Sequence, residues 1–134
     1  EIIDFIPMHH GTMVISYFYE KAKLYYPEGS VNIEDYRYNG PKPNTKETAL
    51  LMLADACESA ARAMIDPDPI KMENMVGNLI EQRINDGQLD ESPLTFKEVK
   101  IIKNSFVSIL LSQHHKRIRY PKQDELENNP KSEN

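Results

Sequence analysis

The sequence predicts an all-α fold, a helical bundle with about four main helices. Apolar residues recur at intervals of three and four in four separate segments, and this spacing keeps them on one face of a helix. Proline and glycine stand between the segments, and three of the segments begin with a capping pattern. At 134 residues the chain is long enough for one domain with a single core.

The first helix is expected over residues 8–26. Its apolar residues fall at positions that share one helical face. They are Val14, Tyr17, Phe18, Ala22 and Tyr25. Pro27 and Gly29 directly follow the segment and are expected to end the helix.

A loop is expected over 28–44, with a short helical turn near 33–38. A loop of this length inside a compact domain is often functional. Within it, Tyr36, Arg37 and Tyr38 have side chains that can contact a base or a phosphate. The alternative is that the tyrosines pack against the core.

The second main helix is expected over 44–65, with Asn44 as its N-cap and Glu47 in the capping-box position. Its apolar residues form a continuous stripe, typical of the central helix of a domain. They are Leu50, Leu53, Ala54, Cys57, Ala60, Ala61 and Met64. Cys57 is the one cysteine of the chain, so an intrachain disulfide is excluded and we interpret it as a small buried hydrophobe.

Capping patterns also mark the third and fourth helices. Asp68 is expected to cap the third, which begins at Pro69 and stops before Gly87. The fourth is expected over 95–118 and opens with the capping box Thr95-Phe96-Lys97-Glu98.

The overall charge excludes one class of partner. With 16 Lys and Arg against 21 Asp and Glu, the formal net charge is −5, which argues against broad electrostatic attraction to DNA or RNA. No apolar run in the sequence reaches the length of a membrane span, and we expect no signal peptide in it. The first residue is not Met, and the first six residues resemble the inside of an element, so we expect a piece of a longer protein.

Two adjacent histidines, His9 and His10, stand at the expected start of the first helix. Adjacent helical side chains diverge by about 100°, but in a first turn, where the chain is still bending, two imidazoles can converge on one metal ion. Neutral imidazole binds iron, manganese and zinc. Asp55 favours this interpretation, because it is a lone carboxylate among apolar neighbours, where an unpaired buried charge is costly. The alternative is an ordinary surface pair of histidines.

Three segments in consistent order resemble a known family. They are 9–12 (His-His-Gly-Thr), 38–47 (Tyr-Asn-Gly-Pro-Lys-Pro-Asn-Thr-Lys-Glu) and 53–62 (Leu-Ala-Asp-Ala-Cys-Glu-Ser-Ala-Ala-Arg). They resemble the cytoplasmic HD domain of the bacterial seven-transmembrane-HD phosphodiesterases, and the closing segment 113–121 resembles the end of that domain. The resemblance covers about residues 1–121.

The resemblance implies a helical bundle of the HD phosphohydrolase type, of which residues 1–121 are the C-terminal half. Residues 122–134 are polar and have no apolar periodicity, so they are expected to form a disordered tail or linker. The family's paired histidines match His9 and His10, as ligands of one metal ion, and its late metal-binding aspartate matches Asp55, as a ligand of the other. The implied cofactors are two divalent metal ions, iron or manganese. The family's defining His-Asp pair has no counterpart here, so we expect the remaining N-terminal half of the domain as a partner.

The implied activity is a metal-dependent phosphodiesterase that hydrolyses cyclic di-AMP to the linear dinucleotide pApA. The implied location is the cytoplasmic domain of a bacterial inner membrane protein, linked to the membrane only through the transmembrane region of the parent. Arg62 or Arg37 could hold the second phosphate bidentately, the alternative for Arg62 being an ion pair with Glu58. Two other functions remain open, an HD hydrolase of another nucleotide and a catalytically inactive helical module that senses a nucleotide. A homodimer also remains open.

Overall fold

The computed structural model describes residues 2–127, and within them it contains helices and no strand, as predicted. The elements are α1 (Ile2–Met8), α2 (Ser16–Tyr25), the 3₁₀ helix η1 (Ile33–Tyr36), α3 (Lys46–Ala63), α4 (Pro69–Asn85) and α5 (Phe96–Glu127). None of the described helices is both long enough and apolar enough to cross a bilayer. The short η1 confirms the helical turn expected in the loop.

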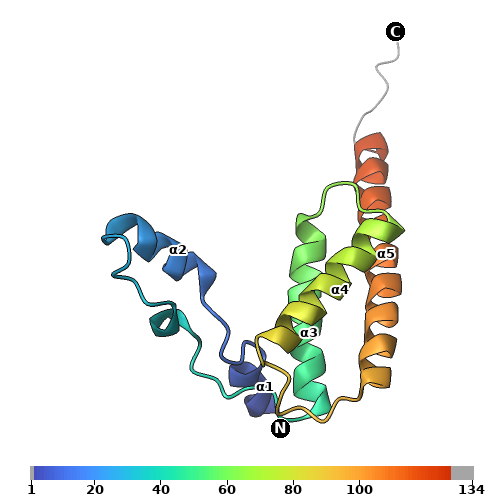
Figure 1. Ribbon diagram of the computed structural model, residues 1–134. Helices are drawn as coiled ribbons and strands as arrows, with labels where there is room; N and C mark the ends of the chain where they lie inside the picture. Colours follow the sequence, from blue (N-terminus) through green and yellow to red (C-terminus); the bar gives the residue numbers. More distant parts are fainter. Residues whose placement is uncertain (1, 128–134) are drawn as a thin grey trace.

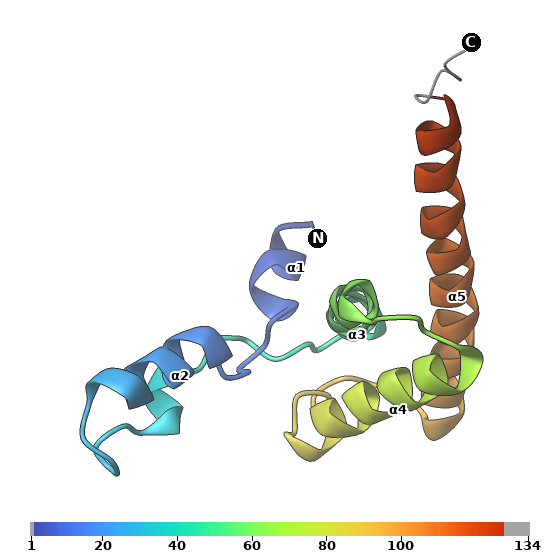
Figure 2. The same ribbon diagram turned by 90° about the horizontal axis from the view of Figure 1, so that it is seen from above.

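Helices α3, α4 and α5 form the packed body of the molecule (Figure 1). Figure 2, in which α3 is seen nearly end-on, shows α1, α4 and α5 around it. The buried core comes mainly from α3 and α4, and its fully buried side chains include Met52, Leu53, Met72 and Val76. Cys57 lies in this core at 1% exposure, as predicted, and burial raises the pKa of its thiol to about 11, so it stays protonated at neutral pH.

Local capping chemistry fixes the starts of α4 and α5 as predicted. The Asp68 carboxylate accepts a hydrogen bond from a backbone N–H in the first turn of α4, and Pro69 is the first residue of this helix. At α5, the Glu98 N–H donates to the Thr95 hydroxyl, and the Thr95 N–H donates to the Glu98 carboxylate. These reciprocal bonds satisfy two backbone donors that a helix start otherwise leaves free.

The expected cap of the second main helix is wrong by one residue. The N-cap of α3 is Thr45, and its partner in the capping box is Thr48 rather than Glu47. Both Asn44 and Thr45 are good N-cap residues, so the sequence does not discriminate between them. Thr48 is only 4% exposed, and its hydroxyl can donate and accept there without burying a charge.

The expected single helix over 8–26 is also wrong. Helix α1 ends at Met8, α2 begins at Ser16, and the chain turns between them. Gly11 has a φ of +52°, in the left-handed region, which a continuous helix does not contain. His9 and His10 therefore follow the end of one helix rather than starting another.

Helix α2 and η1 form an arm that extends away from the packed body (Figure 1). Among the described elements, α2 contacts η1 alone, whereas α1 packs against α3. Two backbone hydrogen bonds join the two sides of the arm where it meets the body: Ile15 N–H to the Tyr36 carbonyl at 2.6 Å and Tyr38 N–H to the Met13 carbonyl at 2.8 Å.

Helix α5 is longer than expected. The sequence predicts a helix over 95–118 and a disordered tail from residue 122, but the helix continues to Glu127. A proline inside a helix removes one N–H bond without always ending the helix. The residues after it include strong helix formers such as lysine, glutamate and leucine. The rest of the expected tail, 128–134, lies outside the described residues.

Candidate metal centre

The fold brings the two histidines and the aspartate singled out in the sequence to one place. His9 and His10 lie in the turn after α1, and Asp55 lies in the middle of α3, against which α1 packs. One ligand atom from each residue lies within 4.8 Å of the others. The packing of α1 on α3 therefore assembles a cluster that could hold a metal ion.

The His9 ring is oriented by the helix that precedes it. Its Nδ1 lies 3.2 Å from the Phe5 carbonyl and is also in hydrogen-bond contact with the Ile6 carbonyl. Because a carbonyl oxygen only accepts, Nδ1 must carry the proton. The lone pair of His9 is then on Nε2, and a metal-binding imidazole typically donates its other nitrogen to a carbonyl in this way.

His10 is held between two rings. It stacks on Tyr38 with a centroid separation of 4.5 Å and an interplanar angle of 13°, and its centroid lies 3.8 Å from that of His9. Burial, and then the neighbouring His9, lower the pKa of His10, an effect that Asp55 partly opposes. The lowered pKa favours the neutral imidazole at pH 7, which is the form that binds a metal ion.

Asp55 is exposed, so the expectation of a buried carboxylate is wrong. The apolar stripe of α3 turns Met52, Leu53 and Cys57 into the core, and Asp55 lies outside that stripe. Water can solvate its charge, so burial gives no argument for a metal ion. The argument comes instead from the position of its carboxylate beside the two imidazoles.

The donor set fits the implied metal ions. Two imidazoles and one carboxylate suit first-row divalent ions such as iron and manganese. All three residues are at least partly accessible, and three protein ligands leave coordination positions open, which is typical of catalytic rather than structural sites. A second ion would need ligands from outside the cluster.

Arg37 is already engaged with the protein. Its Nη1 donates to the Thr12 carbonyl at 3.0 Å and lies 3.6 Å from the Asp86 carboxylate, and its Nε donates to Glu34 at 2.9 Å. The guanidinium therefore joins the arm to the turn that carries the histidines.

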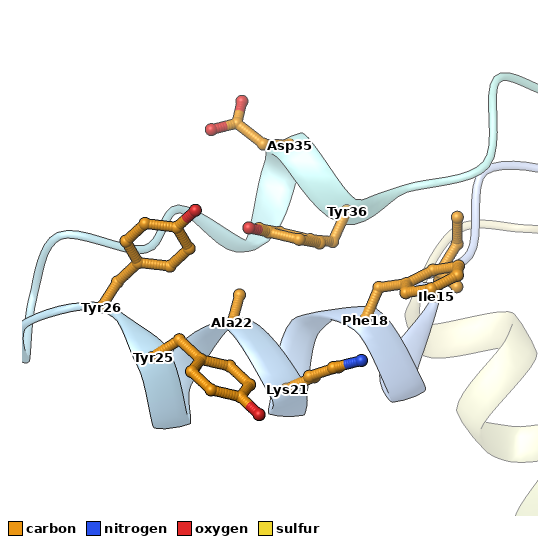
Figure 3. A pocket seen from close by; sticks show the side chains of 8 residues that line it. All are labelled: Ile15, Phe18, Lys21, Ala22, Tyr25, Tyr26, Asp35 and Tyr36. Carbon is orange, nitrogen blue, oxygen red and sulfur yellow. The ribbon is translucent and has the colours of Figure 1, made fainter.

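The other three residues expected near the substrate lie in different surroundings. Arg62 forms an ion pair with Glu58 at 3.0 Å, the alternative foreseen for it. Tyr36 lines a pocket of about 450 Å³ between α2 and η1, and Figure 3 shows its side chain extending over Ala22 toward Tyr26. Tyr38 is in direct contact with the cluster, through its stacking on His10.

Gln88 is the residue near the site that the sequence did not single out. It follows the end of α4, is 1% exposed, and hydrogen bonds to Thr12, which stands two residues after His10. A glutamine after a helix-ending glycine belongs to no periodic pattern and no motif. Its burial could have been found only from the three-dimensional structure.

No protein-family model matches the chain. The chain is 42% identical over 120 residues to the cyclic-di-AMP phosphodiesterase PgpH of Listeria monocytogenes, covering 90% of this chain and 16% of that protein. It is 40% identical over 121 residues to the cyclic-di-AMP phosphodiesterase PgpH of Bacillus subtilis, covering 90% of this chain and 17% of that protein. The chain therefore spans only about a sixth of the length of these curated relatives.

A solved structure is similar over most of the chain. The crystal structure of the L. monocytogenes PgpH HD domain in complex with cyclic di-AMP matches with a TM-score of 0.79 and 39% identity, covering 85% of this chain and 53% of that one. The helical fold and this similarity identify the chain as part of an HD domain. It belongs to the PgpH family of HD domains, as its motifs suggested.

Proposed function

We propose that the chain is the C-terminal half of an HD domain that hydrolyses cyclic di-AMP to pApA. One observation carries this proposal: ligand atoms of His9, His10 and Asp55 lie within 4.8 Å of one another. They do so in a chain 39% identical to an HD domain solved with cyclic di-AMP.

In this proposal His9 and His10 bind one divalent ion and Asp55 binds a second, the ions being iron or manganese. The ligand atoms lie within 4.8 Å of one another, which also fits a single ion, so the assignment of Asp55 to a second ion follows the family pattern and requires further ligands from the rest of the domain. When bound, the ions would lower the pKa of a water molecule and neutralise phosphoryl oxygens during in-line displacement. Their charge also explains how a chain of net charge −5 could bind an anionic dinucleotide.

The chain's own side chains would orient the ligands and the substrate. The carbonyls of Phe5 and Ile6 hold His9 so that Nε2 is free to bind an ion. Tyr38 supports the His10 ring, and it is the strongest of the proposed substrate residues for a base contact because it adjoins the cluster. The other three proposed substrate residues already have protein partners, so each would have to add a substrate contact to those it makes. They are Tyr36, Arg37 and Arg62.

The remaining ligands would come from the rest of the HD domain. We propose that this other half also covers the apolar side chains that α1 exposes, Ile3 at 79% and Ile6 at 67%. We propose further that the full-length protein is a bacterial membrane protein with this domain in the cytoplasm.

The test is hydrolysis of cyclic di-AMP in added Mn²⁺ by the complete HD domain. We expect His9→Ala, His10→Ala and Asp55→Ala each to lower turnover at least about 100-fold, because each removes a direct ligand, while the domain stays folded. His115→Ala, which alters an exposed histidine of α5, is the matched control and should leave turnover unchanged.

Two results would contradict the proposal. Full turnover by His10→Ala would show that hydrolysis does not need the histidine pair. A folded, Mn²⁺-loaded wild-type domain that leaves cyclic di-AMP intact would show that cyclic di-AMP is not the substrate. In the second case a panel of other nucleotides separates a different hydrolase from a module that binds nucleotide without turnover.

A further inference from the structure

Thr12 is held through both its backbone groups and its side chain. Its N–H donates to Gln88 Oε1 at 2.9 Å, and its carbonyl accepts from Arg37 Nη1 at 3.0 Å. Its hydroxyl accepts from Gln88 Nε2 at 3.1 Å. Thr12 closes the turn 9–12, so these bonds fix the side of the histidine turn that α1 does not reach.

The Gln88 amide is itself fixed. Its Nε2 also donates to the Asp86 carboxylate at 2.9 Å, and since a carboxylate only accepts, the amide nitrogen must face Asp86. Oε1 is then directed at the Thr12 N–H. The Asp86 carboxylate in turn lies 3.6 Å from Arg37 Nη1, so Asp86 links the two side chains that hydrogen bond to Thr12. We call Arg37, Asp86 and Gln88 the Thr12 clamp.

The backbone of the turn also lies very close to Gln88 at Gly11. A Cβ placed on Gly11 would lie 2.5 Å from Gln88 Oε1 and 2.8 Å from Met52 Cε, distances too short for any side chain. Gly11 therefore allows the backbone after His10 to approach Gln88 on one side and the core residue Met52 of α3 on the other. A shift of the turn toward either residue would have to displace the hydrogen-bonded Gln88 amide or the buried end of Met52.

We infer that Gln88, braced by Asp86 and Arg37, is a positioning residue for the metal-binding turn. The inference rests on the proposed metal site, because the Gln88 side chain hydrogen bonds to Thr12 and Asp86 among the described residues and acts on the histidines through Thr12. Helix α1 orients His9 through the Phe5 and Ile6 carbonyls, but the turn from His10 to Thr12 lies outside both flanking helices. The clamp supplies the missing constraint, so that both imidazoles are in place before an ion arrives.

As part of the clamp, Arg37 holds the turn through Thr12, which is a different role from the phosphate contact expected for it. Its three partners are Thr12, Glu34 and Asp86, which belong to the turn, the arm and the segment after α4. Arg37 thus connects three parts of the chain at the site. Lysine has the same charge but cannot reach several partners with a planar fork, so Arg37→Lys should loosen the turn.

The experiment uses the complete HD domain and two measurements. The first is deuterium uptake of the peptide containing residues 9–15 without metal, and the second is the Mn²⁺ dissociation constant from the free-ion electron paramagnetic resonance signal. Gln88→Glu keeps the shape but loses the amide donor and puts a charge beside Asp86. We expect faster uptake in 9–15 and an affinity for Mn²⁺ lowered about tenfold. Gln82→Ala, on the exposed face of α4, is the matched control and should change neither.

A second pair of variants guards against loss of folding. Thr12→Val removes the hydroxyl bonds but keeps the N–H bond, and Arg37→Lys keeps the charge. Both should change uptake and affinity in the same direction as Gln88→Glu, but less. If Gln88→Glu fails to fold, these two variants alone test whether the clamp positions the metal-binding turn.

The outcomes separate the clamp from the proposed function. Unchanged uptake in 9–15 would show that there is no clamp. Faster uptake with an unchanged Mn²⁺ affinity would reduce Gln88 to a structural role and overturn the inference. A wild-type domain that binds Mn²⁺ but leaves cyclic di-AMP intact would contradict the proposed function, yet a loss of affinity in Gln88→Glu would still support positioning.

Discussion

At the scale of single residues, Gly11 shows how closely the site depends on the backbone. Its φ of +52° is costly for residues with a Cβ, and Gln88 and Met52 leave no space for one. Gly29 has a φ of +80° but no atom within 4 Å of a built Cβ. Substitution of Gly29 therefore measures the cost of backbone strain alone, whereas substitution of Gly11 adds the cost of a steric clash.

We predict that Gly11→Ala lowers the free energy of unfolding by more than about 2 kcal/mol, and Gly29→Ala by only about 1 kcal/mol. The difference arises because Gly11→Ala must also displace Gln88 or Met52. Urea denaturation of both variants and the wild type, followed by circular dichroism, measures the two values. Equal losses would mean that the neighbours of Gly11 move aside freely.

The sequence identified some of these residues and missed others for a physical reason. His9, His10 and Asp55 were found because their chemistry is recognisable from residue type and motif. Gln88 was not, and Thr12 was found only as the last residue of the 9–12 motif, because their roles come from hydrogen bonds between segments that only the tertiary fold brings together. The burial of Asp55 was also misjudged, since periodicity does not show how far the edge of an apolar stripe extends into solvent.

At the scale of elements, the start of α5 was predicted from four residues because a capping box is local chemistry. The α1–α2 break was missed because apolar residues continue through the turn at helical spacing. A single glycine inside such a pattern does not by itself indicate a turn. A Cβ on Gly11 would collide with Met52 and Gln88, which are far away in sequence, so the need for a glycine here shows only in the tertiary fold.

The start of α5 gives a prediction for pH dependence. An ion pair with Lys46 at 2.9 Å, together with hydrogen bonds from Thr95, lowers the pKa of Glu98 from 4.5 to about 2. A lowered carboxyl pKa means that the folded state favours the charged form. Its stabilisation is therefore fully present above about pH 4.5 and is lost as the pH falls toward 2.

We expect Glu98→Gln to lower Tm at pH 7 and to differ progressively less from the wild type as the pH is reduced toward 2. Thermal melts at several pH values measure the difference. Glu81→Gln, which removes the same charge from the exposed face of α4, should show no comparable trend. A Tm difference that stays constant from pH 7 to pH 2 would exclude the charged cap as its source.

At the scale of the whole molecule, the packed body and the arm differ in what holds them. The hydrophobic core lies in α3, α4, α5 and the segment that joins α4 to α5. The arm is held mainly by α2 packing on η1 and by contacts where Arg37 meets the turn. Several large side chains of α2 are exposed, including Tyr17 at 69% and Tyr25 at 75%. The arm therefore has little core of its own.

This difference predicts that the arm opens without unfolding the body. Segments with few buried apolar contacts exchange amide hydrogens through local opening, whereas core helices exchange only when the whole structure unfolds. In the 134-residue chain, deuterium uptake in α2 should be complete while α3 and α4 are still protected. Urea at concentrations below the unfolding transition should speed exchange in α3 far more than in α2, because global unfolding exposes more surface than local opening does. Equal protection of α2 and α3 would mean instead that arm and body unfold as one cooperative unit, and that the contacts of Arg37 couple them more strongly than their packing indicates.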